Sequence, residues 1–248
     1  MTGKKIKIAL CLSGEPRWAT IGFPYIYETF LLPNNNFEVD VYIHSWNNFR
    51  ALRMYNPKNY LIESVSSLEQ ANKILKQYQI SYPQSFSPLL SELDKYTSMN
   101  NHFINGLLMM DSMQKSFNLT RDFKYDIYIR SRFDLIFNNF TDINQIIIDL
   151  IRNKYDIFIP QKHYEDCGDN ILTDQIAIGN FKSMEIYFNI LQNLNFLMEK
   201  YQVWGENLFE LNLKENNFKI NSYPIDWSLI RNISLHTNSQ KYFRSYNL

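Results

Sequence analysis

Short apolar runs alternate along this chain with longer stretches in which apolar residues recur every three to four positions. The short runs predict buried strands, and the helical spacing predicts amphipathic helices. The predicted strands span 5–12, 37–43, 60–65, 125–129, 155–159, 176–179 and 218–223. The predicted helices span 20–32, 66–78, 97–117, 141–152, 181–200 and 205–214. This alternation is typical of an α/β fold with a mostly parallel central sheet.

The helix expected over 97–117 carries a methionine-rich apolar stripe. Its members recur at helical spacing and are Met99, Phe103, Leu107, Met110 and Met113. A stripe of this kind covers one face of a helix, and we expect it to be buried in the core.

Length and composition narrow the class of protein. A chain of 248 residues fits one large α/β domain or two small ones. Hydrophobic residues make up 45% and aromatic residues 16%, which is enough for a sizeable core. The formal net charge is +0 and the pI is about 6.9, which argues against a dedicated nucleic-acid binder because those proteins carry a basic surplus.

The cysteines and the apolar runs indicate a compartment. Cys11 and Cys167 form neither a disulfide framework nor a zinc pattern, and Cys11 lies inside an apolar run. No run approaches the ~20 apolar residues of a membrane span, and the first run is too short for a signal-peptide core. We therefore expect a protein of a reducing, cytoplasmic compartment without a transmembrane segment.

The segment around which the chain is organised spans 125–137 and reads YDIYIRSRFDLIF. In an extended chain Arg130, Arg132 and Asp134 point to one face, because side chains alternate along a strand. Arginine binds phosphate in a bidentate manner, and aspartate is a hard oxygen ligand for Mg²⁺ or Mn²⁺. This face therefore suits a metal-bound nucleotide diphosphate, while an internal salt bridge between Asp134 and one of the arginines remains the alternative.

Two other strand ends carry candidate side chains. Ser13, Gly14 and Arg17 follow the first strand, and His44 and Trp46 follow the second. Ligands of open α/β sheets bind at the carboxyl ends of strands, so these residues are candidates for a nucleotide pocket. The first group can equally be an ordinary turn, the histidine a structural residue and the tryptophan a cap on the core.

Three further residues are candidates for the chemistry. Asp174 follows an acidic Gly-containing loop and can serve as a general base, with Glu206 as the other option. A turn cap or a favourable position at a helix start explains these two carboxylates equally well. His236 in the polar and aromatic tail is a candidate metal ligand.

Four segments resemble, in their order along residues 5–190, a group of small glycosyltransferases. They read KIALCLSGEPR, VDVYIHSW, YDIYIRSRFDLIF and LTDQIAIGNFKSMEIY. The chain carries no GxSxG, HExxH, P-loop or GxGxxG motif that would favour another class. Enzymes of this group are found in bacteria and large DNA viruses, often in surface-polysaccharide gene sets.

The resemblance implies a single-domain, Rossmann-like glycosyltransferase A-type fold over 1–248. Its nucleotide-sugar-binding part would span 4–137, its acceptor-side part 138–230 and its tail 231–248. The partners implied are a nucleotide-sugar donor and a glycan or glycoconjugate acceptor, without nucleic acid. The implied activity is hexosyl or pentosyl transfer for surface or virion glycan synthesis, in the host cytoplasm if the protein is viral.

The resemblance also implies Mn²⁺ or Mg²⁺, which such enzymes hold with an Asp-x-Asp motif. Here Arg132 stands where that motif has its first aspartate, and Asp134 alone matches. A guanidinium group neutralises phosphate charge without a cation, so Arg132 is a candidate for part of the role of the metal. The departure also keeps open a non-catalytic nucleotide- or glycan-binding module. A methyltransferase is disfavoured because the first loop is not Gly-rich.

Overall fold

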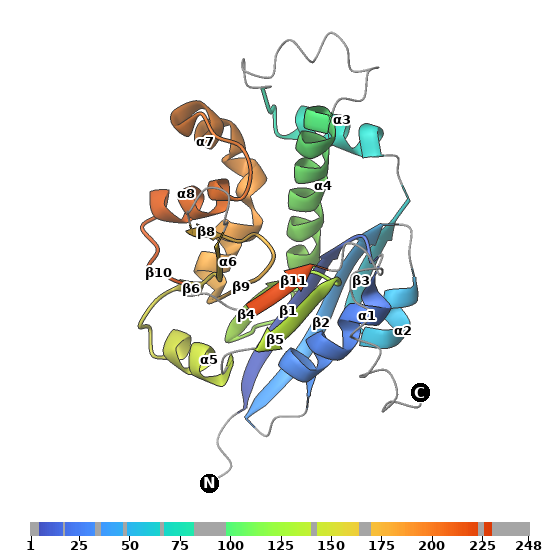
Figure 1. Ribbon diagram of the computed structural model, residues 1–248, viewed down its shortest axis with the longest axis vertical. Coiled ribbons are helices and arrows are strands. Elements are labelled where there is room, and N and C mark those ends of the chain that lie inside the picture. Colours follow the sequence, from blue (N-terminus) through green and yellow to red (C-terminus); the bar gives the residue numbers. More distant parts are fainter. Residues whose placement is uncertain are drawn as a thin grey trace.

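The computed structural model describes residues 5–16, 18–32, 36–46, 49–64, 67–81, 98–139, 143–163, 170–222 and 226–229. Within these ranges a seven-stranded central sheet has the order β10–β6–β9–β4–β1–β2–β3 (Figure 1). Its strands are β1 (Ile6–Gly14), β2 (Phe37–Trp46), β3 (Asn59–Glu63), β4 (Ile127–Ser131), β6 (Ile157–Phe158), β9 (Ala177–Gly179) and β10 (Ile220–Asn221). Two small antiparallel pairs join β5 (Leu135–Asn139) to β11 (Asp226–Leu229) and β7 (Gln161–His163) to β8 (Asn170–Leu172).

The central sheet is mostly parallel, which confirms the predicted α/β class. Strand β1 pairs in parallel with β2 and β4, and β2 pairs in parallel with β3. Strand β9 runs antiparallel to both β4 and β6. The carboxyl ends of β1, β2, β3 and β4 therefore share one edge, and β9 brings its amino end to that same edge.

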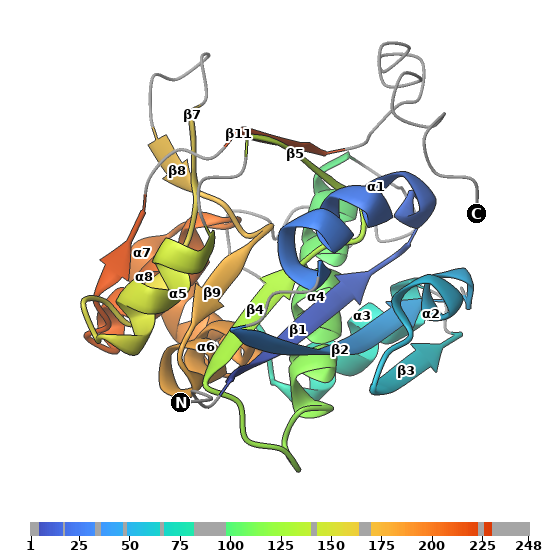
Figure 2. The same cartoon turned by 90° about the horizontal axis from the view of Figure 1, so that it is seen from below.

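Helices cover both faces of the sheet. Helix α1 (Ala19–Ile26) and the β5–β11 pair lie on one face, and α4 (Ser98–Asn118) and α6 (Phe181–Phe188) lie on the other (Figure 2). The remaining helices are α2 (Arg50–Tyr55), α3 (Ser67–Gln77), α5 (Ile143–Ile151), α7 (Leu194–Tyr201) and α8 (Asn207–Glu215), and a π-helical turn at Tyr27–Leu31 follows α1. None of the described helices combines the length and the apolar character that crossing a membrane requires.

Strand β1 shows why the first apolar run is continuous. Ile8, Leu10 and Leu12 belong to the core cluster on the α1 side, whereas Ala9 and Cys11 belong to the cluster on the α4 side. A strand with both faces covered has no polar alternation. The predicted burial of Cys11 is confirmed, and burial raises the pKa of its thiol, so that it behaves as a small apolar residue.

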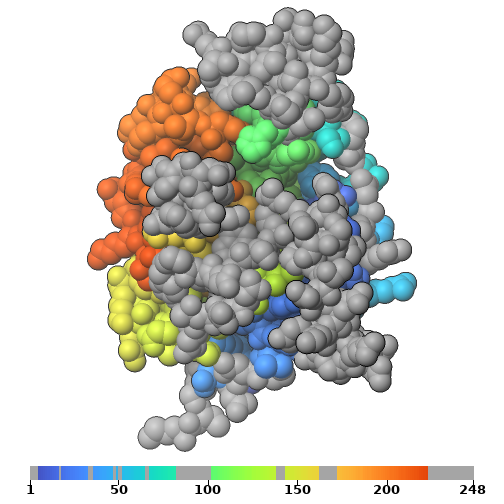
Figure 3. All heavy atoms as spheres, viewed as in Figure 1, coloured from blue at the N-terminus to red at the C-terminus, as the bar shows by residue number. Residues whose placement is uncertain are grey.

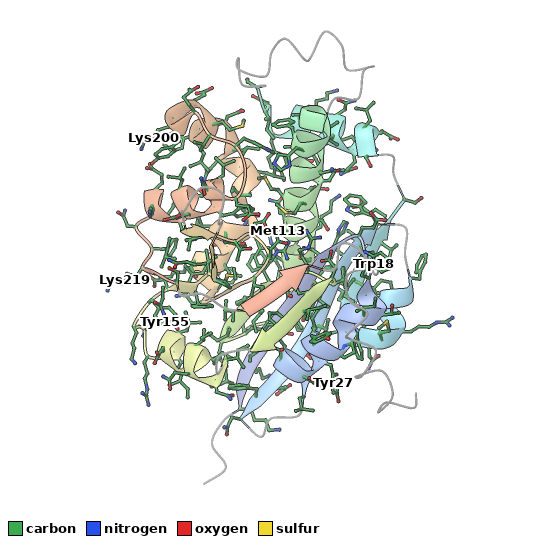
Figure 4. All side chains as sticks on the ribbon, in the orientation of Figure 1. Trp18, Tyr27, Met113, Tyr155, Lys200 and Lys219 are labelled. Atoms are coloured by element: carbon green, nitrogen blue, oxygen red, sulfur yellow. The ribbon has the colours of Figure 1, made fainter. Side chains whose placement is uncertain are left out.

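The methionine-rich stripe of α4 packs into the core as predicted. Phe103, Leu107, Met110 and Met113 are buried, while the side chain of Met99 lies outside the description. Figure 4 labels Met113 of α4, which shares a core cluster with residues of α6. In the space-filling view the green atoms of α4 meet the orange atoms of the later helices at the surface (Figure 3).

The helix predicted over 181–200 is wrong as a continuous element. Helix α6 ends at Phe188, a short 3-10 turn covers Ile190–Gln192, and α7 begins at Leu194. The Asn189 amide donates to the Glu185 carbonyl at 2.8 Å, and its side-chain oxygen accepts from Gln114 of α4 at 2.7 Å. An asparagine side chain that bonds the local backbone competes with a regular helix, and this one also ties the break to α4.

Candidate functional site

The site forms where β4 ends at the shared edge. Strand β4 begins two residues later than the predicted strand and ends at Ser131, so Arg130 lies inside it. Arg130 stands in register with Cys11 of β1 and Ala177 of β9, which places its side chain in the middle of the sheet. Residues 132–134 form a bend, and the alternation that would put three side chains on one face does not extend past Ser131.

The bend brings Arg132 against Asp134. Its Nε donates to Oδ1 and its Nη2 donates to Oδ2, each at 2.7 Å. This is the ion pair that the sequence left open as an alternative. Burial opposes the charge of the guanidinium, but the hydrogen bonds to Asp134 and the negative charges of the nearby carboxylates together outweigh burial and raise the pKa of Arg132.

Arg130 is the other arginine of the segment, and it is fully buried. Its Nη1 donates to the Gln175 carbonyl at 2.7 Å. Burial lowers the pKa of this guanidinium, while Tyr187 and Asp174 oppose that shift. A buried charge that makes so few hydrogen bonds is costly to the fold, which makes Arg130 a candidate for a functional role.

Asp174 lies in the short segment that leads into β9 and is buried beside the arginines. Burial raises the pKa of its carboxyl, and the charges of Arg130 and Arg132 oppose the rise. The Gln175 side-chain amide donates to the Asp174 carboxylate, and the Gln175 backbone N–H donates to Thr173 Oγ1 at 3.1 Å. The direction of β9 explains this position, because the residues that precede the strand reach the edge where β1 and β4 end.

Two residues from the later part of the chain complete this part of the site. The Tyr187 hydroxyl of α6 donates to the Asp174 carbonyl at 3.3 Å. Glu206, just before α8, lies close enough for its charge to act on Arg132 and on Tyr187. The structure therefore brings together the predicted Arg130, Arg132, Asp134, Asp174 and Glu206. It adds Gln175 and Tyr187, which the sequence did not single out as site residues.

The candidates from β1 and β2 lie farther along the same edge. Ser13 stands in register with His44, and Gly14 with Ser45. Gly14 has a φ of +113°, a conformation that side chains other than hydrogen rarely adopt, so the chain leaves β1 through a turn that favours glycine. Arg17, the third candidate of this loop, lies outside the described residues, as does His236.

His44 is directed inward. It is fully buried, and its Nδ1 lies 2.6 Å from Ser112 Oγ of α4 while its Nε2 lies 2.8 Å from Glu63 Oε2 of β3. Lys115 also donates to Glu63 Oε2, at 2.5 Å, which keeps that carboxylate ionised. The ring therefore donates from Nε2 and accepts from Ser112 at Nδ1, which is the neutral form of histidine.

Trp46 lies at the outer end of the same group. Its ring meets the edge of His44 with centroids 4.7 Å apart, and the Lys115 ammonium lies 5.2 Å from its ring centroid. The indole is half-buried and is placed at the carboxyl end of β2. Its place at the edge makes it a candidate for stacking on a ring, and the edge of His44 packs against it.

Within the described residues, five buried side-chain atoms have no hydrogen-bond partner. They are Ser13 Oγ, Ser45 Oγ, Tyr55 Oη, Arg130 Nε and Gln175 Oε1. Four belong to the edge itself, and the Tyr55 ring packs against Phe133 of the bend with centroids 5.9 Å apart. Buried polar atoms in native proteins almost always have a partner. Their concentration here marks this edge as a place for a polar ligand.

A divalent cation fits this donor set poorly. Both carboxylate oxygens of Asp134 already accept from Arg132, and the described residues contain no group of three His, Cys, Asp or Glu side chains that could hold a metal ion. The guanidinium groups of Arg130 and Arg132 would repel a divalent cation placed beside them, which opposes the attraction of Asp174 and Glu206.

Comparisons with known proteins give structural likeness alone. No family model and no curated protein matches this chain. A nucleoside-diphosphate-sugar pyrophosphorylase from Vibrio cholerae RC9 is 8% identical with a TM-score of 0.49, covering 94% of this chain and 99% of its own. CMP:2-keto-3-deoxy-manno-octonic acid synthetase complexed with CTP is 11% identical with a TM-score of 0.48, covering 98% and 99%. Mouse xyloside xylosyltransferase 1 is 12% identical with a TM-score of 0.45, covering 98% and 93%.

Proposed function

We propose that this protein is a nucleotide-sugar-dependent glycosyltransferase whose donor lies along the carboxyl edge of β1, β2 and β4. The observation that carries the proposal is the gathering of two arginines, buried carboxylates and unpartnered polar atoms at that edge. An elongated ligand with negative charge and many polar groups suits such a surface. The order of the sequence segments, which resembles that of small glycosyltransferases, adds a reason to choose a sugar nucleotide.

The reaction requires this edge to stabilise the leaving group and to remove a proton from the acceptor. The acceptor oxygen attacks the anomeric carbon, the bond from that carbon to the diphosphate oxygen breaks, and its electron pair leaves with the diphosphate. The guanidinium groups of Arg130 and Arg132 stabilise the charge that develops on the leaving group. A carboxylate takes the proton of the acceptor hydroxyl. We assign surface or virion glycan synthesis to this activity on the sequence resemblance alone.

Asp174 is the proposed general base, with Glu206 as the alternative. Burial raises the pKa of the Asp174 carboxyl, and a base with a pKa closer to neutral accepts a proton more readily than an ordinary aspartate. Its position beside Arg130 and Arg132 keeps it within reach of a sugar attached to a bound diphosphate. Glu206 is less buried and lies on the side of α8, where a larger acceptor would approach.

The test of the function is a thermal-shift screen of UDP-, GDP-, dTDP- and CMP-sugars, followed by transfer assays with the sugars that bind. We expect one nucleotide to raise the melting temperature and its sugar to be transferred or hydrolysed. A bound ligand at 100 times its dissociation constant stabilises a protein by about 2.7 kcal/mol, which a melting curve detects readily. Binding without transfer or hydrolysis across a broad acceptor panel would favour a non-catalytic binding module. Absence of any shift would count against the proposal.

The choice of base has its own prediction. Asp174→Asn keeps the shape of the side chain and removes its basicity, so we expect kcat to fall by about 100-fold or more while donor binding changes little. Glu206→Gln should lower kcat by far less. Steady-state kinetics at saturating donor would measure both variants, and the reverse order of effects would move the role of base to Glu206.

A further inference from the structure

We infer that Asp134 positions Arg132, and that Arg132 with Arg130 takes the place of a divalent cation at the donor diphosphate. The inference rests on the proposed function and states which side chains neutralise the charge of the donor diphosphate. It starts from the ion pair of the bend, in which Asp134 uses both carboxylate oxygens on the Nε and Nη2 nitrogens of Arg132. Asp134 is thereby a positioning residue rather than a metal ligand.

The ion pair leaves a free edge on the guanidinium. A guanidinium group has five N–H donors in a planar fork, and the contact with Asp134 uses one of them on Nε and one on Nη2. The outer edge, formed by Nη1 and the second hydrogen of Nη2, is the edge that grips a phosphate in a bidentate manner. Arg132 can therefore bind Asp134 and a phosphate at the same time.

In the ion pair, Arg132 is more exposed than Asp134, as its proposed contact with a phosphate requires. The Arg132 side chain is 31% exposed and the Asp134 side chain 11% exposed, so the cation faces outward and the carboxylate lies behind it. A carboxylate that served as a metal ligand would need the opposite order, with its oxygens toward the diphosphate. Here the negative charge supports the arginine from the protein side.

Arg130 supplies the second positive charge. Its Nη1 is held by the Gln175 carbonyl, and its buried Nε has no partner among the described residues. Together the two guanidinium groups carry two positive charges, one of which is paired with Asp134. Asp174 acts electrostatically on both arginines from the β9 side, and Glu206 acts on Arg132 from the α8 side.

The first experiment measures binding in the absence of metal. The wild-type protein is titrated by calorimetry with UDP, GDP, dTDP, CMP and inorganic diphosphate, once in EDTA and once with Mn²⁺. We expect the preferred nucleoside diphosphate to bind in EDTA with an affinity within about threefold of that in Mn²⁺. A calorimetric titration with Mn²⁺ alone should give no saturable heat.

The second experiment is a double-mutant cycle on the pair. Arg132→Ala should weaken nucleoside diphosphate binding by about 10- to 100-fold, as loss of a charged hydrogen-bonding group does. Asp134→Ala should weaken it in part, because Arg132 loses its orientation. The double variant should bind no worse than Arg132→Ala, since a residue that acts only through its partner has no effect without it. Melting curves of each variant check that the fold persists.

A matched control comes from the end of α5. Lys154, which follows the helix, pairs with the partly buried Asp149 at 2.7 Å, away from the shared edge. Lys154→Ala, Asp149→Ala and their double variant should leave nucleotide affinity unchanged. Arg132→Lys serves as a second control on geometry, because an ammonium keeps the charge but lacks the fork.

The outcomes separate this inference from the proposed function. Nucleotide binding that requires Mn²⁺, together with loss of the metal response in Asp134→Ala, would overturn the inference and leave a metal-dependent transferase. Additive effects of Arg132→Ala and Asp134→Ala would likewise overturn the positioning role. No binding by any probe, with or without metal, would remove the proposed function together with the inference that rests on it.

Discussion

Arg130 places a positive charge in the core, where few hydrogen-bond partners surround it. Its side chain is fully buried, yet it donates one hydrogen bond, to the Gln175 carbonyl, and its Nε has no partner among the described residues. A charge buried in this way often stabilises a protein less than an apolar residue of the same volume would. Asp174 and Tyr187 act electrostatically on the same guanidinium, so we explain the residue by the positive charge that it adds to the neighbouring candidate site rather than by its packing in the core.

This contrast predicts the behaviour of Arg130→Met. Methionine keeps most of the volume but leaves the buried Asp174 carboxyl without the charge of Arg130, so we expect the pKa of Asp174 to rise further and the melting temperature to fall. Nucleoside diphosphate binding should weaken by about 10-fold or more because one of two guanidinium groups is lost. Melting curves and calorimetry on the same sample measure both. A variant that binds as well as the wild type would show that Arg130 serves the fold alone.

At the scale of elements, a polar network joins β2, β3 and α4. Glu63 of β3 accepts from His44 of β2 and from Lys115 of α4, and Lys115 also pairs with Asp111 at 2.8 Å. Gln70 of α3 donates to Asp111 at 3.0 Å, which brings a fourth element into the network. The network lies beneath Trp46, so it fixes the outer end of the candidate site to the helical layer.

The network predicts how stability depends on pH. Burial lowers the pKa of His44, Lys115 lowers it further, and Glu63 and Asp111 oppose the shift. In the unfolded chain this histidine regains a pKa near 6.5, so below that pH the unfolded state binds more protons. The free energy of unfolding should therefore fall as the pH drops below 6.5, by at most about 1.4 kcal/mol per pH unit for this group. Urea unfolding between pH 5.0 and 7.5 measures the slope.

A matched variant isolates the contribution of His44. Glu63 does not interfere in this window: although burial opposes its charge, hydrogen bonds from Lys115 and His44 lower the pKa of its carboxyl, so it contributes only in acid. His44→Gln should flatten the slope, whereas His102→Gln, at an exposed position of α4, should keep it. Equal slopes in the wild type and in His44→Gln would show that the histidine does not set this dependence.

At the scale of the whole molecule, the sequence predicted the architecture and the edge that carries the candidates. Apolar runs with both faces buried reveal parallel strands, and parallel strands place their carboxyl ends side by side. For that reason Ser13, His44 and Arg130 could be assigned to one edge without coordinates. Burial on both faces also made Cys11 predictable, since β1 offers no polar alternation.

The rest depends on contacts that a local pattern does not encode. The apolar run of β9 has the same appearance in either direction, so its antiparallel course and the role of Gln175 could not be foreseen. Tyr187 reaches Asp174 only through the packing of α6 on the sheet. The break at Asn189 depends on a hydrogen bond from Gln114, which is distant in sequence. Whether His44 faces a ligand or the core is decided by α4.

The bend that carries Arg132 and Asp134 has a rigid support on its other side. A methyl group added at Gly22 of α1 would stand 2.0 Å from the Phe133 carbonyl oxygen, so helix and bend touch backbone to backbone. No side chain lies between Gly22 and the bend at this contact, so no change of rotamer can compensate for a movement of the bend. The bend can then adjust to substrates only together with α1. Directed evolution of donor preference should accordingly select changes in the β1 and β2 ends or before β9, while Gly22 and Phe133 stay invariant among improved variants.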